Sequence, residues 1–275
     1  MYSGTTIHGK SGGVIGAHQK IDRVARRHLK SSLPSVVTFP DSKAILHFEG
    51  RHGPDGIKRK SPARDEPWHY IDPTDREDTQ LLGLINDHIN NLIASLADGN
   101  EHRAAFEAAW LAHAIVDGLT PAHHYPLEAK IEELWGRPKE SRITIRDKNI
   151  IKGSSRRDTL SKNWEYWGAK GVFTTHFMFE WGFATTIAPL RLDKGKPSPN
   201  DRIRVESEGF GALFMEALHK VYDMKMYDTF HKKGWTRSLA RQSREQLAPI
   251  MIKTVVLAWH YAAVKAAERI ERRTS

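Results

Sequence analysis

Cysteine is absent from this chain of 275 residues. Its absence excludes a disulfide framework, a thiolate zinc site, an iron–sulfur cluster and a cysteine nucleophile. It assigns no redox compartment, because a chain without thiols is equally suited to the inside and the outside of a cell. A metal site in this protein would therefore depend on nitrogen and oxygen ligands.

Long apolar runs are scarce. The first sixteen residues, MYSGTTIHGKSGGVIG, hold no apolar run of seven or more, so we expect no signal peptide and a cytoplasmic protein. Residues 171–190 come closest to a membrane span, but four threonines, a proline, a histidine and a glutamate suit lipid poorly. We expect a buried core helix there, no transmembrane segment, and at most peripheral contact with a membrane.

Signatures of other hydrolytic and phosphate-binding sites are missing. The stretch GKSGG at 9–13 lacks the following Gly-Lys-Ser/Thr of a phosphate-binding loop, and it follows no strand pattern. No Ser–His–Asp arrangement, internal repeat or low-complexity tract is recognisable in the sequence.

Composition and periodicity indicate a single all-α domain over residues 1–275. Apolar residues make up 39% and charged residues 27%, as in ordinary globular proteins. Apolar side chains recur at helical spacing, for example at Leu82, Ile85 and Ile89. Proline-rich residues 31–67 are expected to be irregular, and 190–204 to form a polar loop. Helices are expected at 16–30, 79–96, 101–117, 171–187, 205–232 and 237–272.

Positive charge is concentrated in residues 137–170, called the basic insert below. The chain has 42 Lys and Arg against 33 Asp and Glu, and the insert holds ten against four, or +6 of the total +9. Within it, Arg142-Ile143-Thr144-Ile145-Arg146 alternates and predicts a strand of a short β-hairpin.

Aromatic residues lie among these cations. Trp164 and Trp167 stand between Lys162 and Lys170. Such rings suit single-stranded nucleic acid, on which bases stack, and equally an anionic membrane surface, where Trp lies at headgroup depth. Trp164 and Trp167 are therefore candidate substrate-binding residues, and both kinds of partner stay open.

Histidine is unusually frequent, with 15 residues, and one motif joins three residues able to bind a metal. His113 and Asp117 are four residues apart, and Pro121 and His123 follow, in the pattern HxxxDxxxPxH. Residues four apart on a helix are neighbours, so both side chains point where the apolar stripe points. Burying an unpaired carboxylate is costly, and a metal ion removes that cost. A hydrogen-bonded His–Asp pair in a polar core is the alternative.

A second pair at the same spacing is His176 and Glu180. Glu180 is the only formally charged residue between 171 and 190. A single carboxylate in such an apolar segment needs a partner, and a divalent cation shared with His176 would supply one. A Lys or Arg from elsewhere in the chain is the alternative.

Three further residues complete a family pattern. His69 lies in Trp68-His69-Tyr70-Ile71-Asp72-Pro73, Asp55 lies fourteen residues before it in a Gly-Pro-Asp-Gly turn, and His18 lies in the first expected helix. Together with the two pairs, these residues resemble the superfamily of zinc-dependent phospholipases C and single-strand-specific zinc nucleases. The resemblance covers most of residues 16–185. The WHYIDP stretch and Glu180 are closer to the phospholipase C branch.

The resemblance implies three clustered zinc ions. Its ligand sets are Asp55, His69, His113 and Asp117 for one ion; His123, His176 and Glu180 for a second; and His18 with a bridging Asp117 for the third. In the family, the amino group and carbonyl of an N-terminal Trp complete the third site, and no early Trp exists here. His8 is a candidate replacement, a newly cleaved N-terminus is another, and a weak or empty third site is the remaining alternative.

The activity that the resemblance implies is phosphodiester hydrolysis by a zinc-bound hydroxide, with Asp55 taking a proton from the water. Paired divalent ions would clamp the attacking and leaving oxygens. A phospholipid headgroup is the expected substrate and single-stranded nucleic acid the alternative, with His124 as a candidate substrate contact. Two other classes stay open: a non-catalytic helical domain with structural metals, and a nucleic-acid-binding module that uses the basic insert alone. The oligomeric state is not predicted.

Overall fold

The structure, a computed structural model, describes residues 1–2, 16–63, 70–124 and 127–274, and every regular element in those ranges is a helix. The α-helices are α1 (Ala17–Leu29), α2 (Ser42–His47), α3 (Pro54–Lys60), α4 (Gln80–Ala97), α5 (Glu101–Gly118), α6 (Leu127–Trp135), α7 (Ile145–Asn149), α8 (Arg156–Trp167), α9 (Val172–Ile187), α10 (Pro199–Glu208), α11 (Phe210–Asp223), α12 (Met226–Lys233), α13 (Arg237–Gln242) and α14 (Ala248–Thr274). The short 3₁₀ turns are η1 (Lys30–Ser32), η2 (Gly50–His52), η4 (Pro121–His123), η5 (Lys139–Ser141) and η6 (Asp193–Gly195), and η7 (Ser243–Leu247) is a π-helical turn. The all-α prediction is confirmed for the described residues.

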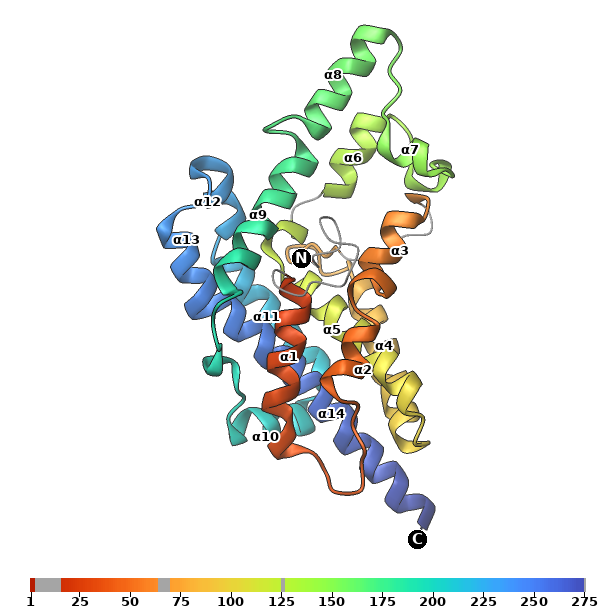
Figure 1. The fold of residues 1–275 in the computed structure, drawn as a ribbon, viewed down its shortest axis with the longest axis vertical. Coiled ribbons are helices and arrows are strands. Elements are labelled where there is room, and N and C mark those ends of the chain that lie inside the picture. Colours follow the sequence, from red (N-terminus) through yellow and green to blue (C-terminus); the bar gives the residue numbers. More distant parts are fainter. Residues whose placement is uncertain (3–15, 64–69, 125–126, 275) are drawn as a thin grey trace.

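The main core lies around α14, which packs against α1, α4 and α5 (Figure 1). Trp259 is the largest fully buried side chain of α14, and it donates its indole N–H to the carbonyl of Ala108 at 3.0 Å. Among the described residues, the stretch Arg237–Arg273 is long and apolar enough to cross a membrane, and 72% of its most apolar window is buried inside the protein.

The end of α5 is held at a close helix crossing. Asn100 caps its start by accepting a hydrogen bond from the backbone of Arg103 at 3.0 Å. At its other end, a Cβ on Gly118 would lie 2.7 Å from Leu81 and 2.9 Å from Phe214. The glycine therefore lets α4 and α11 approach α5 where His113, Asp117 and the turn η4 follow one another.

The predicted β-hairpin at 142–146 is wrong. Thr144 accepts a hydrogen bond from the backbone N–H of Asp147 at 3.0 Å and caps α7, which begins at Ile145. Arg142 is buried, with its guanidinium 5.4 Å from the ring centre of Trp135. The alternation of polar and apolar residues thus marks a helix cap and a buried cation rather than a strand.

Other boundaries differ from the sequence predictions. Residues 31–67 contain α2 and α3, and α10 begins inside the predicted loop 190–204. The helix predicted at 205–232 is interrupted where Gly209 and Lys225 take positive φ angles of 83° and 48°. One side of α9 is buried as predicted. Two of its other side chains, Phe173 and Met178, are 39% and 47% exposed.

Residues 127–170, which carry α6, α7 and α8 and are called the arm below, include the whole basic insert. They extend past α3 and the N-terminus at the upper end of the molecule in Figure 1. The arm has a small apolar cluster of its own, separate from the main core. Its buried members are Ile131, Leu134, Trp135, Ile151 and Tyr166.

Candidate metal centre

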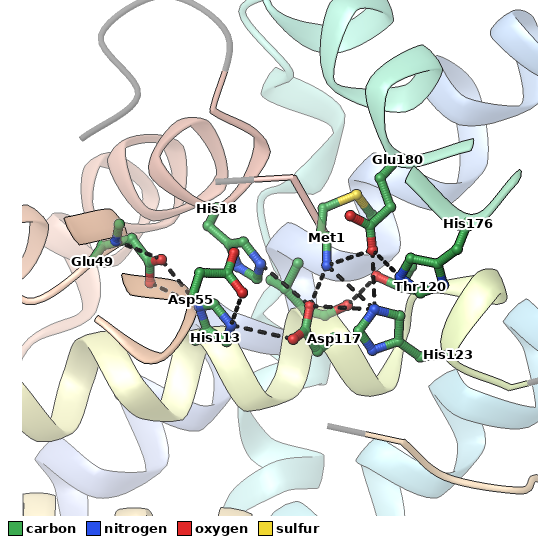
Figure 2. A network of polar contacts seen from close by, with 12 residues as sticks. Met1, His18, Glu49, Asp55, His113, Asp117, Thr120, His123, His176 and Glu180 are labelled. Carbon is green, nitrogen blue, oxygen red and sulfur yellow. Dashed lines mark hydrogen bonds and ion pairs between the residues drawn. The ribbon is translucent and has the colours of Figure 1, made fainter. Parts of the chain in front are cut away.

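Four helices and one turn carry the site, and α5 lies at its centre. His113 and Asp117 project from the same face of α5, and their exposed fractions are 0% and 2%. Figure 2 shows His18 and Asp55 on one side of Asp117, and His123, His176 and Glu180 on the other. The structure thus brings together all the predicted metal ligands that it describes; His8 and His69 lie outside the described residues.

The first group of potential ligands is His18, His113 and Asp117. Nε2 of His18 lies 3.2 Å from one carboxylate oxygen of Asp117, and Nε2 of His113 lies 3.2 Å from the other. All three side chains are buried. Each oxygen of the carboxylate therefore faces one imidazole, as in a bridging ligand.

Asp55 joins this group from the first turn of α3. Its Oδ1 lies 3.9 Å from Nε2 of His113, and its side chain is 25% exposed. Burial alone would raise the pKa of Asp55, but the positive charges of His113, the Met1 amino group and His18 lower it below its ordinary value. Asp55 is therefore an ionised carboxylate at the boundary between the buried ligands and solvent.

The second group is His123, His176 and Glu180. Oε1 of Glu180 lies 3.0 Å from Nε2 of His123 and 2.8 Å from Nε2 of His176. Burial opposes ionisation of Glu180, yet the Met1 amino group and His176 bring its pKa well below the ordinary value. Desolvation is the largest cause that lowers the pKa of His123 to about 3. The group thus combines an ionised carboxylate with a neutral imidazole, and both are metal-ligand forms.

The donor atoms fit a divalent metal. A tetrahedral ion with bonds of 2.0–2.1 Å separates its ligand atoms by about 3.3 Å. The ligand atoms of each triad lie within 4.8 Å of one another, and the four carboxylate–imidazole distances within the triads are 2.8–3.2 Å. Nε2 of His18, the nitrogen that faces Asp117, is buried and makes no hydrogen bond of ordinary geometry. Such orphaned donors are rare in folded proteins. Two buried triads in this chain can therefore hold metal ions.

The amino group of Met1 lies between the two groups (Figure 2). It forms an ion pair with Asp117, lies 3.0 Å from Oε1 of Glu180, and lies 3.5 Å from Nε2 of His123. Burial disfavours its charge, but Asp117, Glu180 and Asp55 raise its pKa to about 10. From the sequence, we expected His8 or a newly cleaved N-terminus at this position and did not name the amino group of Met1.

The neighbouring residue holds the start of the chain in place. The carbonyl of Tyr2 accepts a hydrogen bond from the backbone N–H of Ala17, at the beginning of α1, at 2.7 Å. The ring of Tyr2 packs edge-on against Phe177 and Trp181 of α9, with centroids 5.6 and 5.0 Å apart. These contacts join α1 and α9 beside the metal centre.

Glu49 is a second residue that sequence reasoning missed. Its carboxylate accepts a hydrogen bond from Nδ1 of His113 at 3.0 Å and another from the backbone of Gly50 at 2.9 Å, and it is 0% exposed. A carboxylate on Nδ1 fixes the histidine tautomer that leaves Nε2 free for a metal. No local spacing could reveal it, because Glu49 and His113 are 64 positions apart.

A cavity of about 400 Å³ opens onto the two groups. At its inner end are five ligand candidates, namely Asp55, Asp117, His123, His176 and Glu180. Its wall holds four cationic side chains, Lys58, Arg59, Arg142 and Lys148. Aromatic rings complete it: Tyr2, Tyr70, Tyr166, Trp167, Phe173 and Phe177. The lining thus combines candidate metal ligands with cationic and aromatic side chains.

The three predicted substrate contacts have different surroundings. Trp167 lines the cavity, whereas Trp164 is 74% exposed on the outer side of α8. His124 does not face this cavity: its Nε2–H donates to the carbonyl of Gly118 at 2.7 Å, and it lines a separate cavity beside α11 and α12. Burial lowers the pKa of His124 to about 4. The structure thus gives His124 a role in holding the turn after α5.

The chain matches no protein-family model, no curated protein and no solved structure in comparisons with each.

Proposed function

We propose that this protein is a zinc-dependent phosphodiesterase of the phospholipase C type. The observation that carries the proposal is the pair of buried His/carboxylate triads, joined through Asp117 and the Met1 amino group, at the inner end of an open cavity. Nitrogen and oxygen ligands of this kind suit zinc. The sequence resemblance supplies the reaction class, and the arrangement of the side chains supports it.

The resemblance divides these ligands among three ions. His123, His176 and Glu180 would hold one ion, and His113, Asp117 and Asp55 would hold a second, to which the resemblance adds His69. His18 would share Asp117 with a third ion. The Met1 amino group lies beside Asp117, where the resemblance requires an N-terminal nitrogen, and this contact supports a third site.

Bound zinc would supply a water of lowered pKa and a positive field for the phosphoryl oxygens. Asp55 would accept the proton of that water, because its carboxylate is ionised and its side chain is 25% exposed toward the cavity. Glu49 would hold the ring of His113 in orientation. The cationic side chains of the cavity wall would bind the substrate's negative charge.

A single-strand-specific nuclease is the second candidate. The rings of Tyr70, Tyr166 and Trp167 in the cavity wall favour it, because flat rings between cations also accept nucleic-acid bases. The aromatic wall suits the apolar part of a phospholipid equally well. A direct comparison of phospholipid and single-stranded nucleic acid as substrates therefore decides between the two candidates.

Metal content and hydrolysis of a chromogenic phosphodiester test the proposal together. We expect two or three zinc ions per chain by elemental analysis and activity that a chelator abolishes. Asp55→Asn should lower the rate by about 10²–10⁴-fold, whereas Asp87→Asn, on the exposed side of α4, should leave it unchanged. Phospholipid vesicles and single-stranded DNA, each tested as substrate, then distinguish the two candidates. Zinc without hydrolysis would leave a structural metal site, and absence of zinc would overturn the proposal.

A further inference from the structure

Exposed apolar side chains are concentrated on one part of the molecule. Among the described residues, eleven large apolar side chains are exposed, and seven of them lie between positions 143 and 173. These seven are Ile143, Ile145, Ile150, Leu160, Trp164, Trp167 and Phe173. They belong to the arm and to the first turn of α9. Such a concentration of exposed apolar side chains indicates an interaction site.

Helix α8 carries the central stripe of this surface. Leu160, Trp164 and Trp167 are spaced i, i+4 and i+7, so they share one face, and they are 73%, 74% and 42% exposed. The other side of α8 contributes Tyr166, which packs edge-on against Trp135 in the core of the arm. The stripe therefore remains exposed to solvent, while the side of α8 that carries Tyr166 packs in the core of the arm.

Cations lie at both ends of the stripe, and the exposed Glu165 lies beside Trp164. Arg156 and Arg157 are exposed at the start of α8, and Lys170 is exposed just beyond its end. The basic insert as a whole carries ten Lys and Arg against four Asp and Glu. An amphipathic surface that combines Trp and Leu with Lys and Arg fits the headgroup region of an anionic bilayer.

One end of the stripe lies in the wall of the cavity that opens onto the candidate metal centre. Trp167 is part of the stripe and also lines the cavity, as does Phe173, whose ring centre lies 4.7 Å from that of Trp167. In Figure 1 the arm extends away from the main core on the side of the site. A surface bound to the stripe would thus be adjacent to the cavity.

We propose that the exposed face of α8, with Leu160 and Trp164 at its centre, binds the surface of an anionic lipid bilayer. The aliphatic members of the patch favour lipid over nucleic acid, because Leu160, Ile143 and Ile145 offer no ring on which a base can stack. The assignment of this face to bilayer binding depends only on the residues of the arm. That it delivers substrate from the bilayer to the cavity rests on the proposed function.

Vesicle co-sedimentation tests the assignment. The full-length protein is mixed with vesicles of phosphatidylcholine alone, or with 30% phosphatidylglycerol, in a buffer that contains a chelator. We expect binding at least ten times stronger to the anionic vesicles, weakening with salt, and a further tenfold loss in the double variant Leu160→Ser/Trp164→Ser. Ile203→Ser is the matched control, because Ile203 is 63% exposed on α10, outside the arm. It should bind as the wild type does.

The outcomes separate the two proposals. The chelator removes any metal, so vesicle binding reports the arm even if the protein has no phosphodiesterase activity. Equal binding by the wild type and the double variant, with both folded by circular dichroism, would overturn the assignment. It would also be overturned if the double substitution weakened binding to a single-stranded oligonucleotide and left vesicle binding unchanged, which would make the stripe a nucleic-acid surface.

Discussion

The imidazole rings of His18 and His113 are stacked face to face, with centroids 3.8 Å apart and planes 3° from parallel. Each ring directs Nε2 at Asp117, at 3.2 Å. Two protonated rings at this separation would repel each other in a buried site. Burial alone would lower the pKa of His113, whereas Glu49 and Asp117 raise it well above its ordinary value. Metal ions bound at Nε2 would hold both rings neutral and remove the repulsion, so the stack is compatible with the candidate metal centre.

Metal removal should destabilise the protein. An ion that binds the folded state alone adds about 2.7 kcal/mol of stability at a hundredfold excess over its dissociation constant. We therefore expect a chelator to lower the melting temperature by several degrees and added zinc to restore it. Calorimetry with and without chelator measures this effect. An unchanged melting temperature together with zinc-free protein would contradict the metal centre.

Substitution of Glu49 should weaken metal binding, although Glu49 would act through His113 and would not contact the ion. In Glu49→Gln, the amide can still contact Nδ1 of His113 but loses the negative charge that raises the basicity of the ring. Loss of such a carboxylate costs about 10–100-fold in metal affinity or activity. Competition with a chromophoric zinc chelator measures the affinity. Glu140→Gln, an exposed substitution in the arm, is the control and should bind zinc as the wild type does.

Two glycines give opposite predictions for stability. A Cβ on Gly182 of α9 would lie 2.4–2.9 Å from the indole of Trp235, so Gly182→Ala should cost about 1–3 kcal/mol through overpacking. A Cβ on Gly83 of α4 would meet nothing within 4 Å. Gly83→Ala should therefore add about 0.5–1 kcal/mol, because alanine favours a helix interior. Urea unfolding of both variants checks the pair. A destabilised Gly83→Ala would show that α4 packs differently.

The start of α10 should be sensitive to acid. Partial burial alone would raise the pKa of Asp201, but hydrogen bonds from Ser198 and Lys253 lower it below the ordinary value. A carboxyl with a lowered folded-state pKa stabilises fully above its unfolded pKa of about 4, and this stabilisation is lost as the pH falls through the folded value. Asp201→Asn should thus cost about 1 kcal/mol at pH 7, and the difference from wild type should shrink below pH ~4.

Urea unfolding of the wild type and the Asp201→Asn variant at pH 7 and pH 3 measures this difference. Asp87→Asn removes a charge from an exposed position of α4 and controls for net charge. A difference that stays constant between the two pH values would exclude ionisation of Asp201 as the cause.

The sequence alone was sufficient for features that depend on local spacing. Helical periodicity identified α4, α5 and α14, because burial of one helix face imposes a period of 3.6 residues. The apolar run at 171–190 identified α9. The same geometry put His113 beside Asp117 and His176 beside Glu180. Sequence predictions were wrong where one short pattern is compatible with two structures. The alternation at 142–146 is one example, since Thr144 uses its hydroxyl to cap a helix.

Local spacing left open how the pairs combine, and only the family resemblance implied the ligand sets. In the structure, the pair on α5 gains His18, whose Nε2 lies 3.2 Å from Asp117. The pair on α9 gains His123, which lies 57 positions from Glu180 in the sequence. Glu49 contacts His113, and the Met1 amino group contacts Asp117, 116 positions away in the sequence. No sequence motif indicates either contact. The outward stripe of α8 likewise depends on which face the arm buries. Packing of a chain into a core determines such contacts, and spacing along the sequence does not encode them.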